Sequence, residues 1–303
     1  MRCRRSTRRR CASPTGVRSE RSAAEPIAIE RGRWPMDGHL EMEAVMLKGI
    51  SGRMALVTGA AGGIGSATCR RLHAEGANVV AVDIDGAGLD ALVAELGDRA
   101  LAVRADVTDA QETERFFAAA VERFGAVDMF HANAGVESKV LPVASFDLAD
   151  FEKVFAVNVR SAFLGSSAAV RQMMTQPTAG KIVFTASIAG LKSDGGVSVY
   201  NASKHAVIGL ARSLMKETGA LGIRVNVVAP GVVDTRMMKP LEDGLGALAG
   251  IDGATLKAAL LTAVPLGRYA EADEVAATVA WLLSDEVPYM HGEVVTVGGG
   301  LYP

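Results

Sequence analysis

From Arg53 onward, short apolar runs bounded by glycine or aspartate alternate with longer segments of helical period. This alternation is typical of a parallel sheet whose strands are joined by crossover helices. The apolar runs predict strands at 54–58, 78–83, 100–106, 127–132, 180–187, 223–230 and 293–297. The intervening segments predict helices at 63–76, 86–96, 109–124, 147–175, 199–219 and 271–285, with Asp109 and Asp147 as N-caps. We therefore expect an α/β fold, a Rossmann-type doubly wound parallel sheet of about seven strands with helices on both faces.

The sequence also predicts how the chain is divided. No proline- or glycine-rich linker interrupts residues 49–303, which we expect to form a single domain. Residues 234–268 are rich in Met, Leu, Gly and Ala, and we interpret this stretch as a mobile lid. Residues 1–48 hold ten arginines before Trp34 and few apolar side chains, so we expect a disordered or non-native basic extension. A nucleic-acid-binding arm is the alternative, and Met36, Met42 and Met46 are possible working starts.

Composition excludes several classes of protein. The formal net charge is −2, and no basic run with interleaved aromatics follows the N-terminal region, so we expect no nucleic-acid partner. The three cysteines are too widely spaced to indicate a disulfide framework or a metal site. No stretch approaches the roughly 18 apolar residues that span a bilayer, and the basic N-terminus lacks the apolar segment of a secretory signal. We expect a cytoplasmic protein without membrane contact.

A glycine-rich turn links the first predicted strand to the first predicted helix. Glycines there let the main chain approach a pyrophosphate, and the helix N-terminus presents free N–H groups to the anion. Taken alone, the spacing also fits an ordinary tight turn. The residues predicted to contact a dinucleotide in this turn are Gly59, Gly62, Gly63, Ile64 and Gly65.

The second predicted strand ends in Asp83, 24 residues after Gly59. A carboxylate there accepts hydrogen bonds from the adenosine ribose and repels a 2′-phosphate. Since neither Gly62 nor Ile84 supplies a compensating cation, we predict NAD rather than NADP. Further cofactor contacts are expected where the third and fourth strands end, at Asp106, Val107, Asn133, Ala134 and Gly135.

Ser187 closes the fifth predicted strand, and Tyr200 and Lys204 share one face of the helix that follows. An ammonium about 5 Å from a phenol lowers the phenol pKa by about two units at an effective dielectric of about 20. A tyrosine tuned in this way exchanges a proton with a substrate hydroxyl, while the serine holds the same oxygen. The pair alone is typical of any helix surface. Its order along the chain, after the glycine turn and Asp83, is what indicates chemistry.

With these motifs, residues 53–303 resemble the single-domain NAD-dependent short-chain dehydrogenase/reductases. The family's T-G-x-x-x-G-x-G turn matches Thr58 to Gly65, its N-A-G motif matches Asn133 to Gly135, and its Y-x-x-x-K motif matches Tyr200 to Lys204. Its catalytic serine lies thirteen residues before the tyrosine, as Ser187 does.

The resemblance assigns further roles. Asn158, in the sequence V-N-V, would be the catalytic asparagine that holds a proton-relay water next to Lys204; its residue type alone indicates only a mid-helix polar side chain. Tyr200 and Lys204 would also contact the cofactor, and Lys204 the nicotinamide ribose. His131 departs from the family pattern, and we interpret it as structural. The resemblance also implies a homotetramer formed through helices 147–175 and 199–219. The residues matching the family's nicotinamide contacts are Pro230, Gly231, Val233 and Thr235.

Together these features predict an oxidoreductase that transfers a hydride between NAD(H) and a secondary alcohol or ketone. Candidate substrate contacts are largely apolar and favour a small, weakly polar, cyclic or terpenoid-like substrate. These candidates are Glu137, Ile188, Ala189, Met237 and Met238. The alternatives are an NAD-linked sugar or 3-hydroxyacyl dehydrogenase and, in another class, a non-catalytic NAD-binding sensor.

Overall fold

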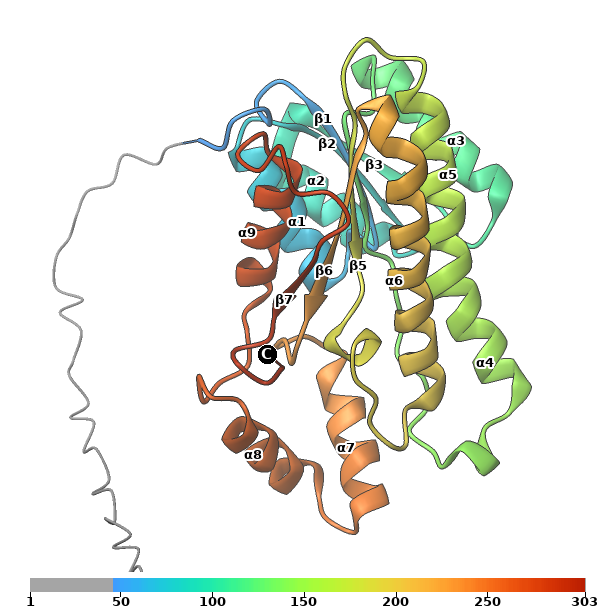
Figure 1. Cartoon of the computed structure of the whole chain (residues 1–303), viewed down its shortest axis with the longest axis vertical. Helices are drawn as coiled ribbons and strands as arrows, with labels where there is room; N and C mark the ends of the chain where they lie inside the picture. The colour runs from blue at the N-terminus through green and yellow to red at the C-terminus, as the bar shows by residue number, and fades with distance from the viewer. Residues whose placement is uncertain (1–45, 303) are drawn as a thin grey trace, which may run out of the picture. The chain divides into compact units, whose positions relative to one another are not determined.

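A seven-stranded parallel sheet forms the centre of the computed structural model, which describes residues 46–302 (Figure 1). All seven strand predictions are confirmed, and the observed ends differ from the predicted ones by at most two residues. The strands are β1 Met54–Thr58, β2 Asn78–Asp83, β3 Ala100–Arg104, β4 Met129–Ala132, β5 Lys181–Thr185, β6 Arg224–Pro230 and β7 Val294–Val297. The predicted extension and the residues Cys3 and Cys11 lie outside the described residues, except for positions 46–48.

Helices cover both faces of the sheet, as expected for strands that read as continuous apolar runs. On one face, α1 Gly63–Ala74, α2 Gly86–Leu96 and α9 Ala272–Leu283 enclose one apolar core; on the other, α3 Ala110–Phe124, α5 Ser161–Met173 and α6 Ser198–Thr218 enclose a second. Figure 1 shows these two helical layers on opposite sides of the strands. The doubly wound fold is therefore confirmed.

The two predicted N-caps are confirmed by their hydrogen bonds. The Asp109 carboxylate accepts from the main-chain N–H groups of Gln111 at 2.7 Å and Glu112 at 2.9 Å. The Asp147 carboxylate accepts from the N–H of Asp150 at 2.7 Å, at the start of α4 Leu148–Phe155. Each carboxylate thus satisfies main-chain donors that have no partner within the helix.

The predicted helix 147–175 is interrupted, and in this respect the prediction is wrong. A π-helical turn, Ala156–Arg160, joins α4 to α5 and contains Asn158. Such a turn widens the helix by one residue and is frequent at functional sites. Asn158 in this turn is hydrogen-bonded to the main chain of Val136, in a loop 22 residues earlier.

The sheet order β3-β2-β1-β4-β5-β6-β7 reverses direction between β1 and β4. Connections leave these two strands toward opposite faces, so a crevice opens beyond their carboxyl ends. The glycine turn after β1 and the N-A-G motif after β4 therefore meet at this point. Ligands of doubly wound sheets bind there.

Two helices fill the stretch predicted to be a lid. They are α7 Met238–Ala249 and α8 Gly253–Ala263, and they lie beyond the strand ends in Figure 1. In residues 46–302, no single helix is long and apolar enough to cross a bilayer; α7 and α8 reach that composition only as a pair, bent by 100°.

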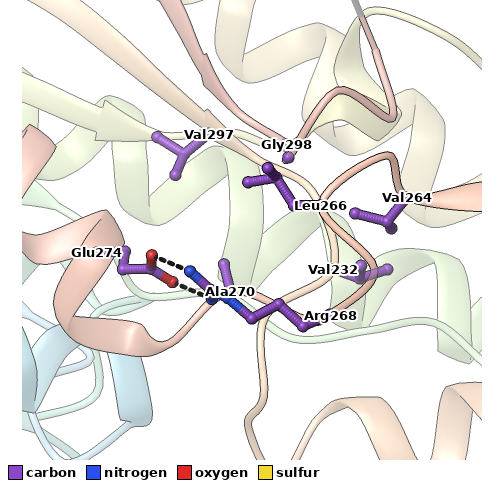
Figure 2. Close-up of a pocket in the computed structure, with 9 residues that line it drawn as sticks. Val232, Val264, Leu266, Arg268, Ala270, Glu274, Val297 and Gly298 are labelled. Carbon is purple, nitrogen blue, oxygen red and sulfur yellow. Dashed lines mark hydrogen bonds and ion pairs between the residues drawn. The ribbon is translucent and has the colours of Figure 1, made fainter. Parts of the chain in front are cut away.

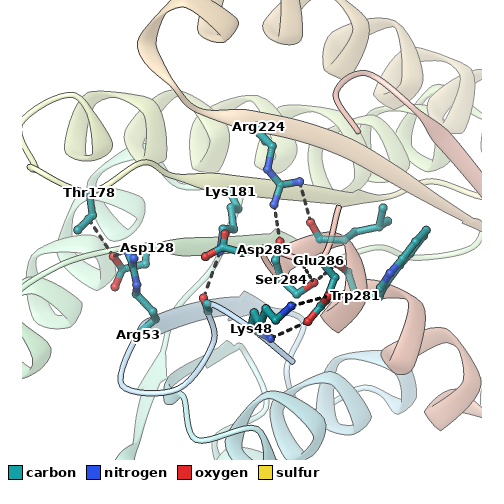
Figure 3. A network of polar contacts seen from close by, with 12 residues as sticks. Lys48, Arg53, Asp128, Thr178, Lys181, Arg224, Trp281, Ser284, Asp285 and Glu286 are labelled. Atoms are coloured by element: carbon teal, nitrogen blue, oxygen red, sulfur yellow. Dashed lines mark hydrogen bonds and ion pairs between the residues drawn. The ribbon is translucent and has the colours of Figure 1, made fainter. Parts of the chain in front are cut away.

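A polar network ties the opposite, amino end of the sheet together (Figure 3). Lys181, the first residue of β5, donates from Nζ to the Gly49 carbonyl at 3.1 Å and pairs with Asp285 at 2.7 Å. Arg224, the first residue of β6, donates to the Ser284 carbonyl. These contacts anchor the segments before β1 and after α9, so the network stabilises the fold at the end away from the crevice.

Candidate active site

The glycine turn after β1 packs too closely for side chains at several positions. Gly59 has a φ of +66°, and a Cβ on Gly65 would lie 2.0 Å from the Gly59 carbonyl oxygen. A Cβ on Gly63 would lie 2.8 Å from the Thr235 methyl group, which places Thr235 against the start of α1. No side chain caps α1 at its N-cap residue, Gly62. The turn therefore offers an anion an open main-chain cradle and a helix N-terminus.

Asp83 lies beside this turn. Its Oδ2 accepts from the N–H of Ala61 at 2.9 Å, and its Oδ1 accepts from the N–H of Asp85 at 3.0 Å. The carboxylate is thus fixed between β2 and the glycine turn, where the sequence predicted a ribose contact. Ile84 is 64% exposed and supplies no charge. A cation that the sequence did not predict lies nearby: the Arg104 Nε donates to the Ile84 carbonyl at 3.3 Å.

The N-A-G motif after β4 is hydrogen-bonded to the end of β1. The main-chain N–H groups of Asn133 and Ala134 donate to the Thr58 Oγ1 at 3.1 and 3.2 Å. The Asn133 Nδ2 donates to the carbonyls of Thr58 at 3.0 Å and Gly59 at 3.3 Å. The two strand ends that border the crevice are therefore held in one arrangement.

Asn158 is 2% exposed and fixes the chain that follows this motif. Its Oδ1 accepts from the N–H of Val136 at 2.8 Å, and its Nδ2 donates to the Val136 carbonyl and to the Ser203 Oγ, both at 2.9 Å. The π-helical turn brings the amide to the Val136 main chain. A Cβ on Gly135 would lie 3.2 Å from the Lys204 Nζ and 3.4 Å from the Asn158 Oδ1, so these two side chains converge around Gly135.

Lys204 and Tyr200 lie at the start of α6, as predicted, with the Lys204 Nζ 5.6 Å from the centre of the Tyr200 ring. The ammonium donates to the Thr185 carbonyl at 3.1 Å. Burial lowers the pKa of Lys204 to about 8, because the charged form loses hydration. Burial also raises the pKa of Tyr200 to about 12; the Ser187 hydroxyl acts in the opposite direction, and the Glu137 carboxylate raises it further.

The expectation that Lys204 lowers the Tyr200 pKa is therefore wrong for this structure. Loss of hydration raises the Tyr200 pKa by more than the hydrogen bond with Ser187 lowers it, and loss of hydration alone lowers the pKa of Lys204. Of the two groups, Lys204 therefore titrates closer to neutral pH, with a pKa near 8 against about 12 for Tyr200.

Ser187 follows β5 with an extended backbone, at a φ of −173°. Its Oγ accepts from the N–H of Ala189 at 3.1 Å and lies 3.4 Å from the Pro230 carbonyl, to which it donates. The hydroxyl is thus positioned between the ends of β5 and β6. Its effect on the Tyr200 pKa places it near the phenol.

The other predicted cofactor residues have mixed surroundings. Asp106 uses its carboxylate within its own turn, accepting from the N–H and hydroxyl of Thr108 at 2.8 Å. Gly231 packs on the main chain of Gly298, and Val233 pairs with Ala270. The Asp106 side chain is therefore already engaged locally. Val107 packs against the core next to it.

The predicted substrate contacts differ in their accessibility. Ile188 and Met238 are buried, at 7% and 8% exposed, whereas Ala189 and Met237 are half-buried. Glu137 is half-buried and acts on Tyr200, yet within residues 46–302 its carboxylate takes part in no hydrogen bond or ion pair. It is thus a free acceptor beside the phenol.

A small cavity lies next to Gly231 and Val233, whose neighbours Gly298 and Ala270 line it (Figure 2). Its volume is about 60 Å³, far below the space that a dinucleotide fills. Arg268 and Glu274 form a two-fold hydrogen-bonded ion pair on its wall. None of the predicted catalytic side chains lines it. The lining residues are Val232, Val264, Leu266, Arg268, Ala270, Glu274, Val297, Gly298 and Gly299.

Comparison with known proteins gives the site a context. The family model described as short chain dehydrogenase matches residues 53–246. Levodione reductase of Leifsonia aquatica is 40% identical over 253 residues, which cover 82% of this chain and 93% of that protein. Cis-4-hydroxycyclohexanecarboxylate dehydrogenase of Sinomonas cyclohexanicum is 38% identical over 250 residues, covering 82% of this chain and 96% of that protein.

Solved structures agree with the fold. A crystal structure of levodione reductase superposes with a TM-score of 0.78 at 39% identity, covering 82% of this chain and 97% of that one. The 3-ketoacyl-(acyl-carrier-protein) reductase from Brucella melitensis, complexed with NADH, gives a TM-score of 0.74 at 28% identity, covering 83% of this chain and 99% of that one.

Proposed function

This chain belongs to the short-chain dehydrogenase/reductase family, and we propose that it interconverts a small, weakly polar cyclic alcohol and its ketone with NAD(H). It is an oxidoreductase of CH–OH groups. The observation that carries the proposal is the meeting of Ser187, Lys204 and the free carboxylate of Glu137 around Tyr200, beside the crevice at the switch between β1 and β4.

The residues at the crevice fit NAD(H). The turn from Gly59 to Gly65 suits the pyrophosphate, because added Cβ atoms would fill it. Asp83 suits the adenosine ribose, and Lys204 has donors left beyond its bond to Thr185. When bound, NAD⁺ accepts a hydride from the substrate carbon and NADH returns one.

The protein's own groups carry the proton. In oxidation, the Tyr200 oxygen takes the proton from the substrate O–H while the phenol's own proton passes to Lys204, as the substrate C–H bond gives up its hydride to NAD⁺. Ser187 donates a hydrogen bond to the same oxygen and holds it near the phenol. Lys204 accepts that proton in its neutral form, Asn158 converges with Lys204 around Gly135 and positions the relay, and ketone reduction runs through the same groups in reverse.

The substrate class is supported by the predicted substrate contacts. Ile188, Met237 and Met238 are apolar, which suits a ring. The Glu137 carboxylate repels acids and accepts a hydrogen bond from a second hydroxyl group, so neutral substrates are favoured over carboxylates. Two of the relatives described above are named for levodione and for a hydroxycyclohexane compound, which supports a cyclic substrate.

The test is a screen of NAD reduction with cyclic alcohols, sugars and 3-hydroxyacyl thioesters. Turnover should be fastest with the neutral cyclic alcohols; turnover confined to sugars or thioesters would contradict the proposed substrate class. Replacing Tyr200 with Phe should remove nearly all turnover while NAD still binds. Tyr289, which is fully exposed, gives the matched control, and Tyr289→Phe should turn over at the wild-type rate.

We also propose a cytoplasmic homotetramer, with residues 49–303 as one domain. Exposed apolar side chains on α4 and α5 support assembly through these helices, since Leu148, Phe151 and Phe163 are 68%, 41% and 55% exposed. Light scattering of the purified protein should give four times the chain mass. Substituting Phe163 with Glu should then yield smaller species.

A further inference from the structure

We propose that His131 and Thr185 are positioning residues, which hold Asn133 against the glycine turn through a hydrogen-bond chain of fixed direction and so prepare the cofactor crevice. The His131 Nε2 lies 2.8 Å from the Thr185 Oγ1, which donates to the Asn133 Oδ1 at 3.1 Å. This inference rests on the proposed use of NAD(H). It concerns how the site is shaped before the cofactor arrives.

The donor-to-acceptor direction of these hydrogen bonds follows from the end at Asn133. The Asn133 amide faces the carbonyls of Thr58 and Gly59, and only an N–H group can satisfy two carbonyl oxygens. The NH₂ group of Asn133 therefore points to the glycine turn, and its oxygen points to Thr185. Because that oxygen only accepts, the Thr185 hydroxyl must donate to it.

The protonation of His131, at the other end of the hydrogen-bond chain, is then determined as well. A hydroxyl that has given its single proton to Asn133 can only accept from His131. The Nε2 of His131 must carry a proton, and a neutral ring then leaves Nδ1 bare. This agrees with the surroundings of Nδ1, which is buried without a hydrogen-bond partner in the described part of the chain. The ring is 1% exposed, and burial lowers its pKa to about 3, so it stays neutral.

Thr185 also connects this chain to the proton-transfer side of the site. Its hydroxyl reaches Asn133, while its carbonyl accepts from the Lys204 Nζ at 3.1 Å. His131 and Thr185 come from the neighbouring strands β4 and β5, which pair in register from Met129 and Lys181. Thr185 therefore contacts both Asn133, on the cofactor side of the site, and Lys204, on the proton-transfer side.

The first test removes only the hydroxyl. Thr185→Val keeps the shape of the side chain and leaves the Asn133 oxygen and the His131 N–H unpaired, whereas Thr185→Ser keeps the hydroxyl. Titration calorimetry should give an NAD Kd about tenfold weaker for Thr185→Val and within about twofold of wild type for Thr185→Ser. Thr278→Val, on α9, is the matched control and should bind NAD as the wild type does.

The second test addresses the donor. Gln places an amide N–H near the position of the His Nε2, so His131→Gln should keep NAD affinity within about threefold, while His131→Leu weakens it about tenfold. His131 and Thr185 act through the same hydrogen-bond chain. The double variant Thr185→Val, His131→Leu should therefore bind NAD about as weakly as the weaker-binding single variant. Thermal unfolding checks that each protein is folded, and if His131→Leu does not fold, the comparison of Thr185→Val with Thr185→Ser still decides.

A third measurement needs no cofactor. Deuterium exchange of residues 129–137 in the cofactor-free protein should quicken in Thr185→Val and stay at the wild-type rate in Thr185→Ser. Wild-type affinity and exchange in Thr185→Val would overturn the inference, as would equal losses in Val and Ser. The proposed function has a separate test, because it would be contradicted by turnover retained in Tyr200→Phe. That result would leave the NAD affinities of the Thr185 and His131 variants, and so this inference, unaffected.

Discussion

Asn158 holds both main-chain groups of Val136, accepting from its N–H at 2.8 Å and donating to its carbonyl at 2.9 Å. The two residues lie 22 positions apart, one in the π-helical turn and the other in the loop that carries Glu137. This amide therefore links the helix to the loop nearest the phenol. The helix widens at the turn that carries these hydrogen bonds.

Replacing Asn158 with Ala should lower both stability and turnover. The change leaves the Val136 N–H and carbonyl unpaired and frees the loop beside Tyr200, so we expect a loss of about 2–3 kcal/mol of unfolding free energy and a kcat reduced by about 100-fold. Denaturant unfolding and steady-state kinetics measure the two effects. Asn226→Ala is the control, because Asn226 is also buried and also bonds two main-chain groups, of Met290 and Glu293. It should lose similar stability and keep its kcat; equal kcat losses in both would contradict a role for Asn158 in the reaction.

The pKa of Lys204, near 8, predicts a pH dependence for turnover. In oxidation the proton leaves Tyr200 toward Lys204, which accepts it only when neutral. The rate of alcohol oxidation should therefore rise with pH, by up to about tenfold per unit, below about pH 8 and level off above it. The rate of ketone reduction should be level below about pH 8 and fall above it. Kinetics from pH 6 to 10 in both directions test this. Lys204→Met should lose the step, and a wild-type profile that is flat across pH 8 would argue against Lys204 as the acceptor.

The same group predicts an effect on stability. The pKa of Lys204 lies near 8 in the folded chain and at 10.5 ordinarily, so the unfolded state binds more protons between these values. Its contribution to unfolding free energy therefore rises with pH across that window and is least favourable below pH 8. Lys204→Met should be about 1–3 kcal/mol more stable than wild type at pH 7, although inactive. Thermal unfolding at pH 7 and pH 10 measures this, and the advantage should shrink at the higher pH.

The strands could be predicted from the sequence because their apolar runs stand out within single stretches of residues. The runs of β1, β4 and β5 are buried at every position, whereas β7 is only half-buried. The order of the motifs likewise located Asp83 at the end of β2, Ser187 just after β5 and Tyr200 at the start of α6, where they lie. The features that could not be predicted depend on hydrogen-bond partners that lie far apart in the sequence. The π-helical turn depends on Val136, and the link between His131 and Thr185 depends on the pairing of β4 with β5. The spacing of Tyr200 and Lys204 in the sequence predicted that their side chains lie close together. Their pKa shifts depend on burial, which the spacing of two residues does not reveal.

Helices α7 and α8 show a second limit. Gly244, Gly246 and Gly250 interrupt the apolar pattern of residues 234–268, so the stretch reads as irregular. In the structure, Gly246 is needed because a Cβ there would lie 2.9 Å from the Ile251 carbonyl oxygen, and Gly250 ends α7 with a φ of +74°. Residues that lower helix propensity are here required by the packing of the two helices. Whether this stretch moves as a lid stays a prediction.

Asp83 should decide between NAD and NADP, because a cation is already present beside it. Arg104 reaches the Ile84 carbonyl at the end of β2, and the Asp83 carboxylate opposes a phosphate there. Asp83→Ser should therefore raise kcat/KM with NADP by about tenfold or more and lower it with NAD. Adding Arg104→Met should remove the gain with NADP. If the double variant keeps that gain, another cation serves the phosphate; Asp85→Asn, which alters only the cap of α2, is the control.

The contact between Glu242 and Tyr269 should govern the opening of α7. Glu242 is 4% exposed, and the Tyr269 hydroxyl donates to its Oε1 at 2.9 Å. Tyr269→Phe removes this donor from a buried carboxylate and keeps the ring over which the Lys257 ammonium lies, at 5.0 Å from the ring centre. We expect deuterium exchange of residues 238–249 to quicken about tenfold and the KM for the alcohol to rise. Glu242→Gln retains an acceptor for the phenol and should stay closer to wild type than Tyr269→Phe. Equal exchange in wild type and Tyr269→Phe would show that α7 is held by its apolar contacts instead.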